Sequence, residues 1–437
     1  MPLLPVELFL LSWTLVTCLV PVAVYCFARG WLDRRRRYQP VNPEFPPITL
    51  VKPMRGASHA LLEHLASTYE CGYPNTIELI CAVEDPDDPA TLVVAELQKR
   101  FPDQPIRVVV SYGAESIFGK HANLIAGYQA STYDIVVFSD ADVRLEPGQL
   151  QELIPPLSDP RVGCATTGFY QDWDDDLPTA LMAMFVATWA WVPNMATRYI
   201  NQLRYAIGGL MAFRKDVLEE LGGLAAIIAH RISDDAALGK TLRDNGYALY
   251  LASFPYHVRR KEPSVRAVVA NIHRWMLMWR TQGRKMWAHP LWFLSPFPVI
   301  AWLLSWATGI VRPEVAGWTL LAVLLWQMGW GAITIQTFHR GRKPLALLFL
   351  SRPVAEMLMC FSYVWAVLWP FTVWGGRVYR VYYPGDAELV DYVEPLAPIT
   401  DVRLRERMRQ RLTRSRAAGR RAVRLLRQRL SVETSAE

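Results

Sequence analysis

Charged residues are scarce in this 437-residue chain, because Asp, Glu, Lys and Arg together make up only 20% of it. Cysteine is also rare: there are six, and no two have the C-x-x-C spacing typical of zinc sites and redox motifs. Low charge and a 52% share of hydrophobic residues exclude a disordered chain and a small disulfide scaffold. Soluble proteins are typically about 45–50% apolar. The composition therefore indicates an integral membrane protein with a substantial water-soluble part.

Positive charge is concentrated near the end of the sequence. The net charge is +7, and residues 401–430 contain twelve arginines against two acidic residues. Because the rest of the chain is slightly acidic, the basic folded face that nucleic-acid binding requires is not indicated, and we expect no nucleic-acid partner. Leu404, Met408 and Leu412 recur at helical spacing among the arginines. The segment is either a helix on an anionic membrane surface or a solvated tail.

Long apolar runs lie on both sides of the central sequence. Residues 3–28 contain Glu7 as their only charged residue, and four consecutive arginines follow at 34–37. About 20 apolar residues can cross a bilayer as a helix, and a signal peptide would carry its positive charge before the run. The positive-inside bias predicts a retained anchor with the N-terminus outside and the following chain in the cytoplasm. Leu291–Val311 and Val315–Ile335 are predicted to be two more spans.

The last apolar stretch, Leu345–Trp374, contains Arg352-Pro353 and Glu356. A single crossing here would place the arginine-rich tail outside, against the charge bias. We therefore predict an interfacial segment plus a broken or re-entrant pair that returns to the cytoplasm. The predicted regions are an anchor at 1–38, a cytoplasmic domain at 39–288, a C-terminal transmembrane and interfacial region at 289–385, and a basic cytoplasmic tail at 386–437.

The cytoplasmic segment has the pattern of an α/β domain, in which short apolar runs alternate with helical patterns. The predicted strands are Ile48–Lys52, Ile77–Val83, Ile106–Val110, Asp134–Ser139 and Val162–Thr167. The predicted helices are His59–Tyr69, Pro89–Phe101, Lys120–Ala130 and Pro147–Ile154. This alternation indicates a mostly parallel sheet covered on both faces. Ligands of such sheets bind beyond the carboxyl ends of the strands.

An acidic pair follows the fourth predicted strand directly. Asp140 and Asp142 are separated by one residue at the point where the strand ends. Two carboxylates in this position can hold Mg²⁺ or Mn²⁺ and leave ligand positions open for substrate phosphates. A solvated loop or a helix cap also produces this pattern. The position after a buried strand favours the metal site.

Other candidates are ambiguous when each is taken alone. Asp85 follows the second strand and either faces a nucleotide or belongs to the turn before a helix. Asp234-Asp235 begins a helical pattern, so one of them is either a general base or a helix cap. Arg274-Trp275 lies in an amphipathic helix at 263–288. That pair either binds a departing diphosphate and a sugar or rests at the membrane interface.

Taken in order, these residues resemble a known signature. Asp85, Asp140-x-Asp142, Asp235 and Arg274-Trp275 are similar to the D, D, D, (Q/R)xxRW signature of membrane-bound glycosyltransferases with a GT-A fold. The resemblance is closer to the ceramide glucosyltransferases, glycosyltransferase family 21, and covers most of residues 1–390. The further matching segments are Leu50–Gly56, Val83–Pro89, Lys120–Leu124, Gly209–Asp216 with Gly222-Gly223, and Trp374–Arg380.

The resemblance implies an α/β GT-A domain that binds a UDP-sugar and carries out inverting transfer, most simply of glucose. It implies that Asp85 contacts uridine, that Asp140 and Asp142 hold the nucleotide and its metal, and that Asp235 is the base. Arg274 and Trp275 would close the site over the diphosphate. Lys52 and Lys120 would lie beside the nucleotide. The implied partners are a UDP-sugar, a membrane lipid acceptor and the bilayer of a bacterial-type inner membrane.

Two departures from the family pattern leave the acceptor open. Asn271 stands where the family has Gln or Arg, and Leu181–Asn194 contains no histidine, although eukaryotic ceramide enzymes carry one there. The uncharged residues 181–191 either bound a lipid groove or form a buried helix. Ceramide is the expected acceptor, with diacylglycerol or a hopanoid lipid as alternatives. A polysaccharide synthase and a non-enzymatic transporter or scaffold are the competing interpretations.

Overall fold

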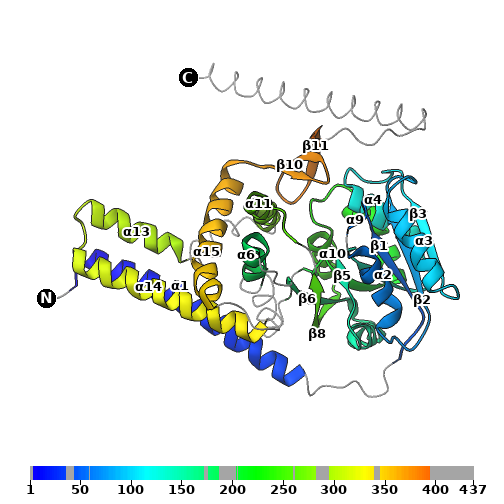
Figure 1. Cartoon of the computed structure of the whole chain (residues 1–437), viewed down its shortest axis with the longest axis horizontal. Helices are drawn as coiled ribbons and strands as arrows, with labels where there is room; N and C mark the ends of the chain where they lie inside the picture. The colour runs from blue at the N-terminus through cyan, green and yellow to red at the C-terminus, as the bar shows by residue number, and fades with distance from the viewer. Residues whose placement is uncertain are drawn as a thin grey trace.

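The protein is described from a computed structural model, which places residues 3–35, 44–58, 60–171, 176–186, 203, 205–258, 261–281, 295–338 and 345–393. Figure 1 shows an α/β domain on one side of the molecule and long helices on the other. The predicted basic tail at 401–430 and the greater part of the uncharged stretch after residue 186 lie outside the described residues.

Eight strands in the described part of the chain form one mixed sheet with the order β3-β2-β1-β4-β7-β6-β8-β5. They are β1 (Ile48–Pro53), β2 (Ile77–Val83), β3 (Ile106–Val110), β4 (Ile135–Ser139), β5 (Val143–Arg144), β6 (Val162–Gln171), β7 (Leu210–Arg214) and β8 (Ala248–Val258). Pairing is parallel from β3 to β4 and between β6 and β8, whereas β7 and β5 are antiparallel to their neighbours. The predicted α/β class and mostly parallel sheet are confirmed.

Helices cover both faces of this sheet because side chains along its strands alternate between two cores. Leu50 of β1 packs beneath one group of helices, and the next residue, Val51, packs beneath the other. The first group is α2 (Leu61–Glu70), α3 (Ala90–Arg100) and α5 (Gln149–Leu153). The second group is α4 (Gly119–Gln129), α8 (Lys215–Glu220), α9 (Leu224–Ile228) and α10 (Asp234–Asp244). A strand buried on both faces produces this two-residue alternation.

Three helices, α1 (Pro5–Arg35), α13 (Pro296–Ala307) and α14 (Pro313–Phe338), pack together away from the sheet (Figure 1). Among the described residues, Pro5–Cys26 and Pro313–Ile333 are long and apolar enough to cross a membrane. The 12 residues of α13 extend only about 18 Å. α13 lies in the described part of the predicted third span at Leu291–Val311, whose first four residues lie outside the described residues, so that span stays a prediction.

Polar contacts join α1 to the turn between α13 and α14. The buried carboxylate of Glu7 pairs with the guanidinium of Arg312 at 2.6 Å. Nearby, the indole nitrogen of Trp302 donates a hydrogen bond to the hydroxyl of Thr14 at 3.0 Å. A buried charge is costly unless it is paired. These contacts therefore hold the beginning of α1 and the α13–α14 turn at the same end of the helical region, as the predicted topology requires.

The segment that begins at Leu345 differs from the prediction. It forms one continuous helix, α15 (Leu345–Leu368), which runs through Pro353 instead of breaking into a re-entrant pair. α15 packs against α14, α11 (Val265–Thr281) and α6 (Leu177–Phe185). This tertiary packing outweighs the backbone hydrogen bond that a proline inside a helix removes.

A second, three-stranded sheet follows α15 in the described chain. It consists of β9 (Phe371–Trp374), β10 (Arg377–Val381) and β11 (Ala387–Tyr392), in the order β11-β10-β9. Gly375 and Gly376 form the turn between β9 and β10 with φ angles of 56° and 71°, a conformation that favours glycine. β10 and β11 pair across the predicted region boundary between residues 385 and 386.

A third apolar core connects this C-terminal region to the α/β domain. Its buried side chains come from α6, α11, α15 and β10, and include Phe185, Ile272, Tyr363 and Tyr379. Phe118, at the beginning of α4, also belongs to it. The helix that carries Arg274 is therefore held between the α/β domain and α15.

Candidate active site

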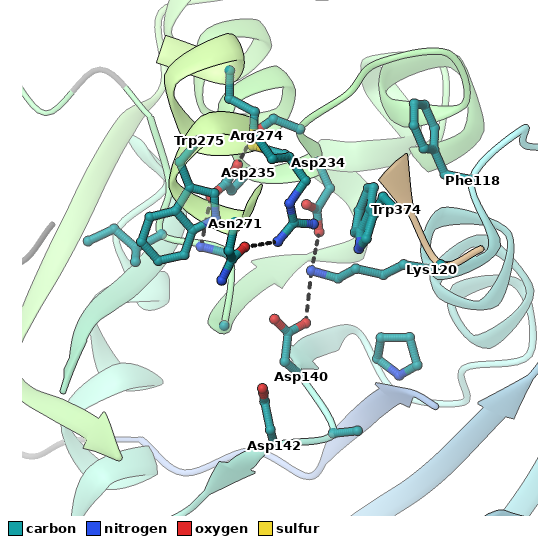
Figure 2. A pocket seen from close by; sticks show the side chains of 18 of the residues that line it. Phe118, Lys120, Asp140, Asp142, Asp234, Asp235, Asn271, Arg274, Trp275 and Trp374 are labelled. Atoms are coloured by element: carbon teal, nitrogen blue, oxygen red, sulfur yellow. Dashed lines mark hydrogen bonds and ion pairs between the residues drawn. The ribbon is translucent and has the colours of Figure 1, made fainter. Parts of the chain in front are cut away.

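A cavity of about 1320 Å³ opens along the carboxyl edge of the large sheet. Its lining includes most of the predicted site residues, which come from separate parts of the sequence: Lys120, Asp140, Asp142, Asp235, Arg274 and Trp275. Figure 2 shows Lys120 between Asp140 and Asp234, with the guanidinium of Arg274 above the end of Lys120 in this view. The carboxyl ends of β1, β4, β6 and β8 all reach this space. The expected position for a ligand in an α/β sheet is thus a real cavity.

Lys120 connects the two acidic segments across the cavity. Its ammonium nitrogen lies 2.8 Å from Oδ1 of Asp140 and 3.1 Å from Oδ2 of Asp234. Burial opposes the charge on Lys120, but the two carboxylates outweigh it and hold its pKa above the usual value. Burial raises the pKa of Asp140 to about 6, against the opposing effect of Lys120. This part of the cavity therefore presents opposite charges close together.

Lys52 lies behind the acidic pair and holds its loop. Its buried ammonium donates hydrogen bonds to the Ser139 hydroxyl at 2.9 Å and to the carbonyls of Asp140 and Val143, both at 3.1 Å. Burial lowers the pKa of Lys52 to about 8. The expected nucleotide contact of Lys52 stays a prediction: its three donor protons are directed at the loop, and its side chain is outside the described cavity lining.

The pair Asp234-Asp235 begins α10, and its two carboxylates have different surroundings. Asp235 accepts hydrogen bonds from the backbone nitrogens of Gly208 at 3.0 Å and Ala236 at 2.7 Å, and from the hydroxyl of Ser233. Burial and the neighbouring charge of Asp234 raise the pKa of Asp235. Burial also opposes ionisation of Asp234, but Lys120 and His121 together outweigh it and lower the pKa of that carboxyl. Environments that separate two pKa values in this way are typical of acid–base sites.

The turn Gly208-Gly209 brings the two acidic segments into register. Besides the bond from Gly208 to Asp235, the carbonyl of Gly209 accepts a hydrogen bond from the backbone nitrogen of Asp140 at 3.0 Å. A Cβ atom at Gly208 would lie 2.8 Å from Oδ2 of Asp235. A Cβ atom at Gly209 would collide with the ring and hydroxyl of Tyr256. This turn can approach both segments only because it has no side chains.

Arg274 and Trp275 are neighbours on α11 but face different walls of the cavity. Arg274 donates a hydrogen bond to Oδ1 of Asn271 at 2.7 Å, one helical turn earlier. Trp275 instead packs near Phe185 and Phe169, with ring centroids 5.5 and 6.1 Å apart. The polar wall of the cavity, which contains Arg274, is therefore distinct from an apolar wall that contains Trp275.

The sequence matches glycosyl transferase family 21 over residues 13–387. The chain belongs to this family. It is 22% identical to ceramide glucosyltransferase 3 of Caenorhabditis elegans over 236 residues, 54% of this chain and 51% of that protein. It is 30% identical to the ceramide glucosyltransferase of Komagataella phaffii over 129 residues, 28% of this chain and 25% of that protein. These alignments span about half or less of each relative's length.

Among solved structures, mannosyltransferase PcManGT from Pyrobaculum calidifontis in complex with GDP-Man and Mn²⁺ aligns with a TM-score of 0.49 and 18% identity. That alignment covers 83% of this chain and 99% of the other. The predicted membership of family 21 is confirmed by the match over residues 13–387. Asn271, which stands where the family signature has Gln or Arg, accepts a hydrogen bond from Arg274 and so orients its guanidinium.

The acidic pair fits a divalent cation. No group of three or more His, Cys, Asp or Glu residues that could hold a metal by itself occurs in the described residues. Asp140 and Asp142 both line the cavity, however, and their carboxylate oxygens are the ligands that Mg²⁺ and Mn²⁺ prefer. Mg²⁺ commonly takes one or two carboxylates and completes its shell with substrate phosphates and water. Asp140 and Asp142 therefore provide enough protein ligands for the cation only when a phosphate ligand is also present.

Asp85 remains a prediction. It lies at the end of β2, and its Oδ1 accepts a hydrogen bond from the backbone nitrogen of Asp87 at 2.9 Å. The described lining of the cavity includes its neighbour Glu84 and does not include Asp85.

Sequence analysis missed several residues of the cavity. Tyr256 lies on β8, which was not predicted, and its ring stacks on Phe169 at 5.4 Å. Trp374 and Arg377 also line the cavity, although they follow the last helix of the described chain. The matching segment Trp374–Arg380 was the available signal for these two residues. The sequence of this segment alone indicates no chemical role, because it does not show which residues the segment contacts.

Proposed function

We propose that this protein transfers glucose from UDP-glucose to the hydroxyl group of a membrane lipid, with ceramide as the acceptor and inversion at the anomeric carbon. One observation carries the proposal: a single cavity has a polar wall with Asp140, Asp142 and Arg274 and an apolar wall with Phe185 and Trp275. Such a cavity suits a reaction between a charged nucleotide sugar and a lipid. Family membership and the names of the aligned relatives support the same reaction.

The polar wall accounts for recognition of the donor. Lys120 and Arg274 are cations that offset the negative charge growing on UDP as its bond to the sugar breaks. Asp140 and Asp142 would hold Mg²⁺ or Mn²⁺ together with phosphate oxygens, and the ion supplies Lewis-acid stabilisation of the leaving diphosphate. Lys52 keeps the loop of the acidic pair in place through its three hydrogen bonds.

Asp235 is the proposed general base. The lipid hydroxyl gives its proton to Asp235, and its oxygen forms a bond to the anomeric carbon on the face opposite UDP. The bond between that carbon and the diphosphate oxygen breaks, and its electron pair leaves with UDP. Burial and Asp234 raise the pKa of Asp235, which makes it a stronger base than a solvated aspartate.

The apolar wall and α15 account for access of a lipid. Phe185 on α6 and Trp275 on α11 belong to the core that packs against α15. On its exposed face, α15 carries apolar side chains that recur every three or four residues: Val354, Met357, Phe361, Val364 and Leu368. A stripe of this kind is typical of a helix that contacts a membrane surface. We infer that the alkyl chains of the acceptor stay in the bilayer while its head enters the cavity.

The apolar helices α1 and α14 support a location in a membrane, and we propose the inner membrane with the α/β domain in the cytoplasm. The positive-inside bias supports this orientation, since four arginines at 34–37 follow the apolar part of α1. UDP-sugars are then available to the cavity from the cytoplasm. The joined ends of α1 and the α13–α14 turn lie on the opposite side of the bilayer.

Product analysis tests the proposal. The purified full-length chain is placed in lipid nanodiscs with Mn²⁺ or Mg²⁺ and offered UDP-glucose, UDP-galactose or UDP-N-acetylglucosamine. Ceramide, diacylglycerol and a hopanoid are supplied as separate acceptors. We expect β-glucosylceramide from the α-linked donor, identified by mass spectrometry and by NMR of the anomeric proton. Failure to glycosylate any lipid with any donor would contradict the proposal.

The variant Asp235→Asn tests the role of the base. Loss of a general base typically costs about 10²–10⁴ in rate. We expect turnover below detection and binding of UDP-glucose close to that of the wild type, measured by calorimetry. Asp216→Asn is the matched control, because Asp216 begins a helix as Asp235 does but is exposed. Near-normal turnover of Asp235→Asn would show that another group removes the proton.

A further inference from the structure

The turn of the small sheet reaches into the cavity from a distant part of the chain. Trp374, Gly375, Arg377 and Tyr379 are all part of the cavity lining. Trp374 pairs with Arg377 across the two-residue turn, so their side chains leave the hairpin at the same level. Nearly 100 residues separate this hairpin from Arg274 in the sequence. Nothing in the reaction described so far uses it.

Trp374 holds the guanidinium of Arg274. The central carbon of the guanidinium lies 4.7 Å from the centroid of the Trp374 ring, within the range of a cation–π contact. On another side, the same guanidinium donates to Asn271. Figure 2 shows Trp374 and Asn271 flanking the Arg274 side chain. Trp374 is itself backed by Phe118 and His121, with centroids 5.6 and 5.7 Å away.

The hairpin that carries Trp374 is fixed to loops on both sides of the site. Arg377 forms an ion pair with Glu84 at the end of β2 and donates a hydrogen bond to the carbonyl of Ile117 at 3.1 Å. The side chain of Arg377 is 6% exposed and that of Glu84 is 25% exposed, so the guanidinium of the pair is shielded from water. Near α10, the backbone nitrogen of Ile232 donates to the carbonyl of Gly385 at 2.9 Å. The small sheet therefore contacts the segments that lead into Lys120 and Asp235.

We propose that Trp374 is a positioning residue of the donor site, which holds the Arg274 guanidinium where the diphosphate leaves, and that the Arg377–Glu84 pair fixes the hairpin in this place. The proposal rests on the proposed sugar transfer and adds a residue to it. An arginine that is held in position before the reaction stabilises developing charge without reorganising at that moment. A long, flexible side chain such as arginine loses this advantage when its contacts are removed.

A double-mutant cycle tests the role of Trp374 in the full-length enzyme. We expect Trp374→Leu to lower kcat roughly 3- to 30-fold, the range of a partly desolvated cation–π contact, and Trp374→Phe to restore part of the loss. In an Arg274→Ala background, Trp374→Leu should lower kcat less than twofold, because the group it positions is gone. Trp369→Leu, an exposed tryptophan near the same sheet, is the control.

Equal losses from Trp374→Leu with and without Arg274 would show that Trp374 acts only on general structure and would overturn the proposal. A wild-type enzyme that transfers no sugar would overturn the proposed function, and this inference with it. An active wild type with additive losses overturns the inference alone. The two failures are therefore distinguishable.

A charge exchange tests the ion pair. Arg377→Glu places two carboxylates together, and we expect it to lower kcat/KM roughly 100-fold or more. The double variant Glu84→Arg/Arg377→Glu should recover at least tenfold of that loss. Arg380→Glu makes the same change on an exposed residue of the same strand and should leave activity within twofold of wild type. No recovery in the double variant would show that the pair does not fix the hairpin.

Discussion

The polar and apolar walls of the cavity are built in different ways. The polar wall combines charged groups from the end of β4 and from α10 and α11, and hydrogen bonds hold several of them, as with Asp235 on Gly208 and Arg274 on Asn271. The apolar wall, with Phe185 and Trp275, comes from α6 and α11, whose buried apolar side chains pack in the third core. In the proposed reaction, recognition of the donor therefore depends on the position of single polar atoms, whereas recognition of the acceptor depends on the apolar area that it buries. Substitutions in the two walls should therefore change different kinetic constants.

After loss of the base Asp235, the largest expected effect belongs to the acidic pair of the polar wall. Asp142→Asn removes a charged oxygen ligand, and metal stabilisation of a leaving group is worth several kcal/mol, so we expect kcat/KM to fall roughly 100-fold or more. The apparent affinity for Mn²⁺, from activity against metal concentration, should weaken together with it. Asp87→Asn, an exposed acid near the end of β2, is the control. If the Asp142→Asn variant had an unchanged metal requirement, Asp142 would not be a metal ligand.

A smaller loss is expected from the glycine that contacts the base. Gly208→Ala places a methyl group 2.8 Å from Oδ2 of Asp235, so the carboxylate must move. A displacement of about 1 Å can cost up to 100-fold in rate, and we expect kcat to fall roughly 10- to 100-fold with little change in the KM for the donor. Gly317→Ala, where a Cβ atom meets open space, is the control. A normal kcat would mean that the position of Asp235 is not critical.

The apolar wall should respond through the acceptor alone. Trp275→Leu removes aromatic area, and we expect the KM for the lipid to rise roughly tenfold while the KM for UDP-glucose stays within twofold. Initial rates measured at varied lipid and fixed saturating donor, and the reverse, give the two constants. The family resemblance implies a role for Trp275 at the diphosphate. A selective increase in the KM for the donor would support that role and would contradict the division into two walls.

The smallest expected effect is a shift in pH dependence. The raised pKa of Asp235 means that the base is protonated, and activity lost, at a higher pH than for a solvated aspartate. The Ser233 hydroxyl donates to Asp235 and stabilises its charged form. Ser233→Ala should therefore move the acid limb of the kcat profile upward by roughly one pH unit. Ser264→Ala, which removes a hydroxyl near the start of α11, should leave the limb in place.

Local patterns were sufficient to predict the first half of the sheet. Strands β1 to β4 follow from short apolar runs between turn residues, and Asp140-x-Asp142 follows from its place after one of them. β8 was missed because Pro255 interrupts its pattern, and α15 was misjudged because Pro353 suggested a break. In both segments tertiary packing outweighs the local preference.

The contacts that complete the site could not be predicted, since they depend on how distant segments fold together. Lys52 was expected beside the nucleotide, and only its three hydrogen bonds reveal that it holds the loop from behind. The contact of Trp374 with Arg274 joins segments on either side of α14 and α15. No spacing rule in the sequence relates such residues. Family resemblance identified the Trp374–Arg380 segment without giving it a role.

The place of the small sheet in the chain has a consequence for biosynthesis. Trp374 and Arg377 are translated after α14 and α15. When Arg274 has been synthesised, the hairpin that contacts it has therefore not yet been made. A nascent chain can form the α/β domain early, but the pocket stays incomplete until the later helices have emerged. The order of synthesis thereby delays completion of the pocket until α15 and the small sheet have been made.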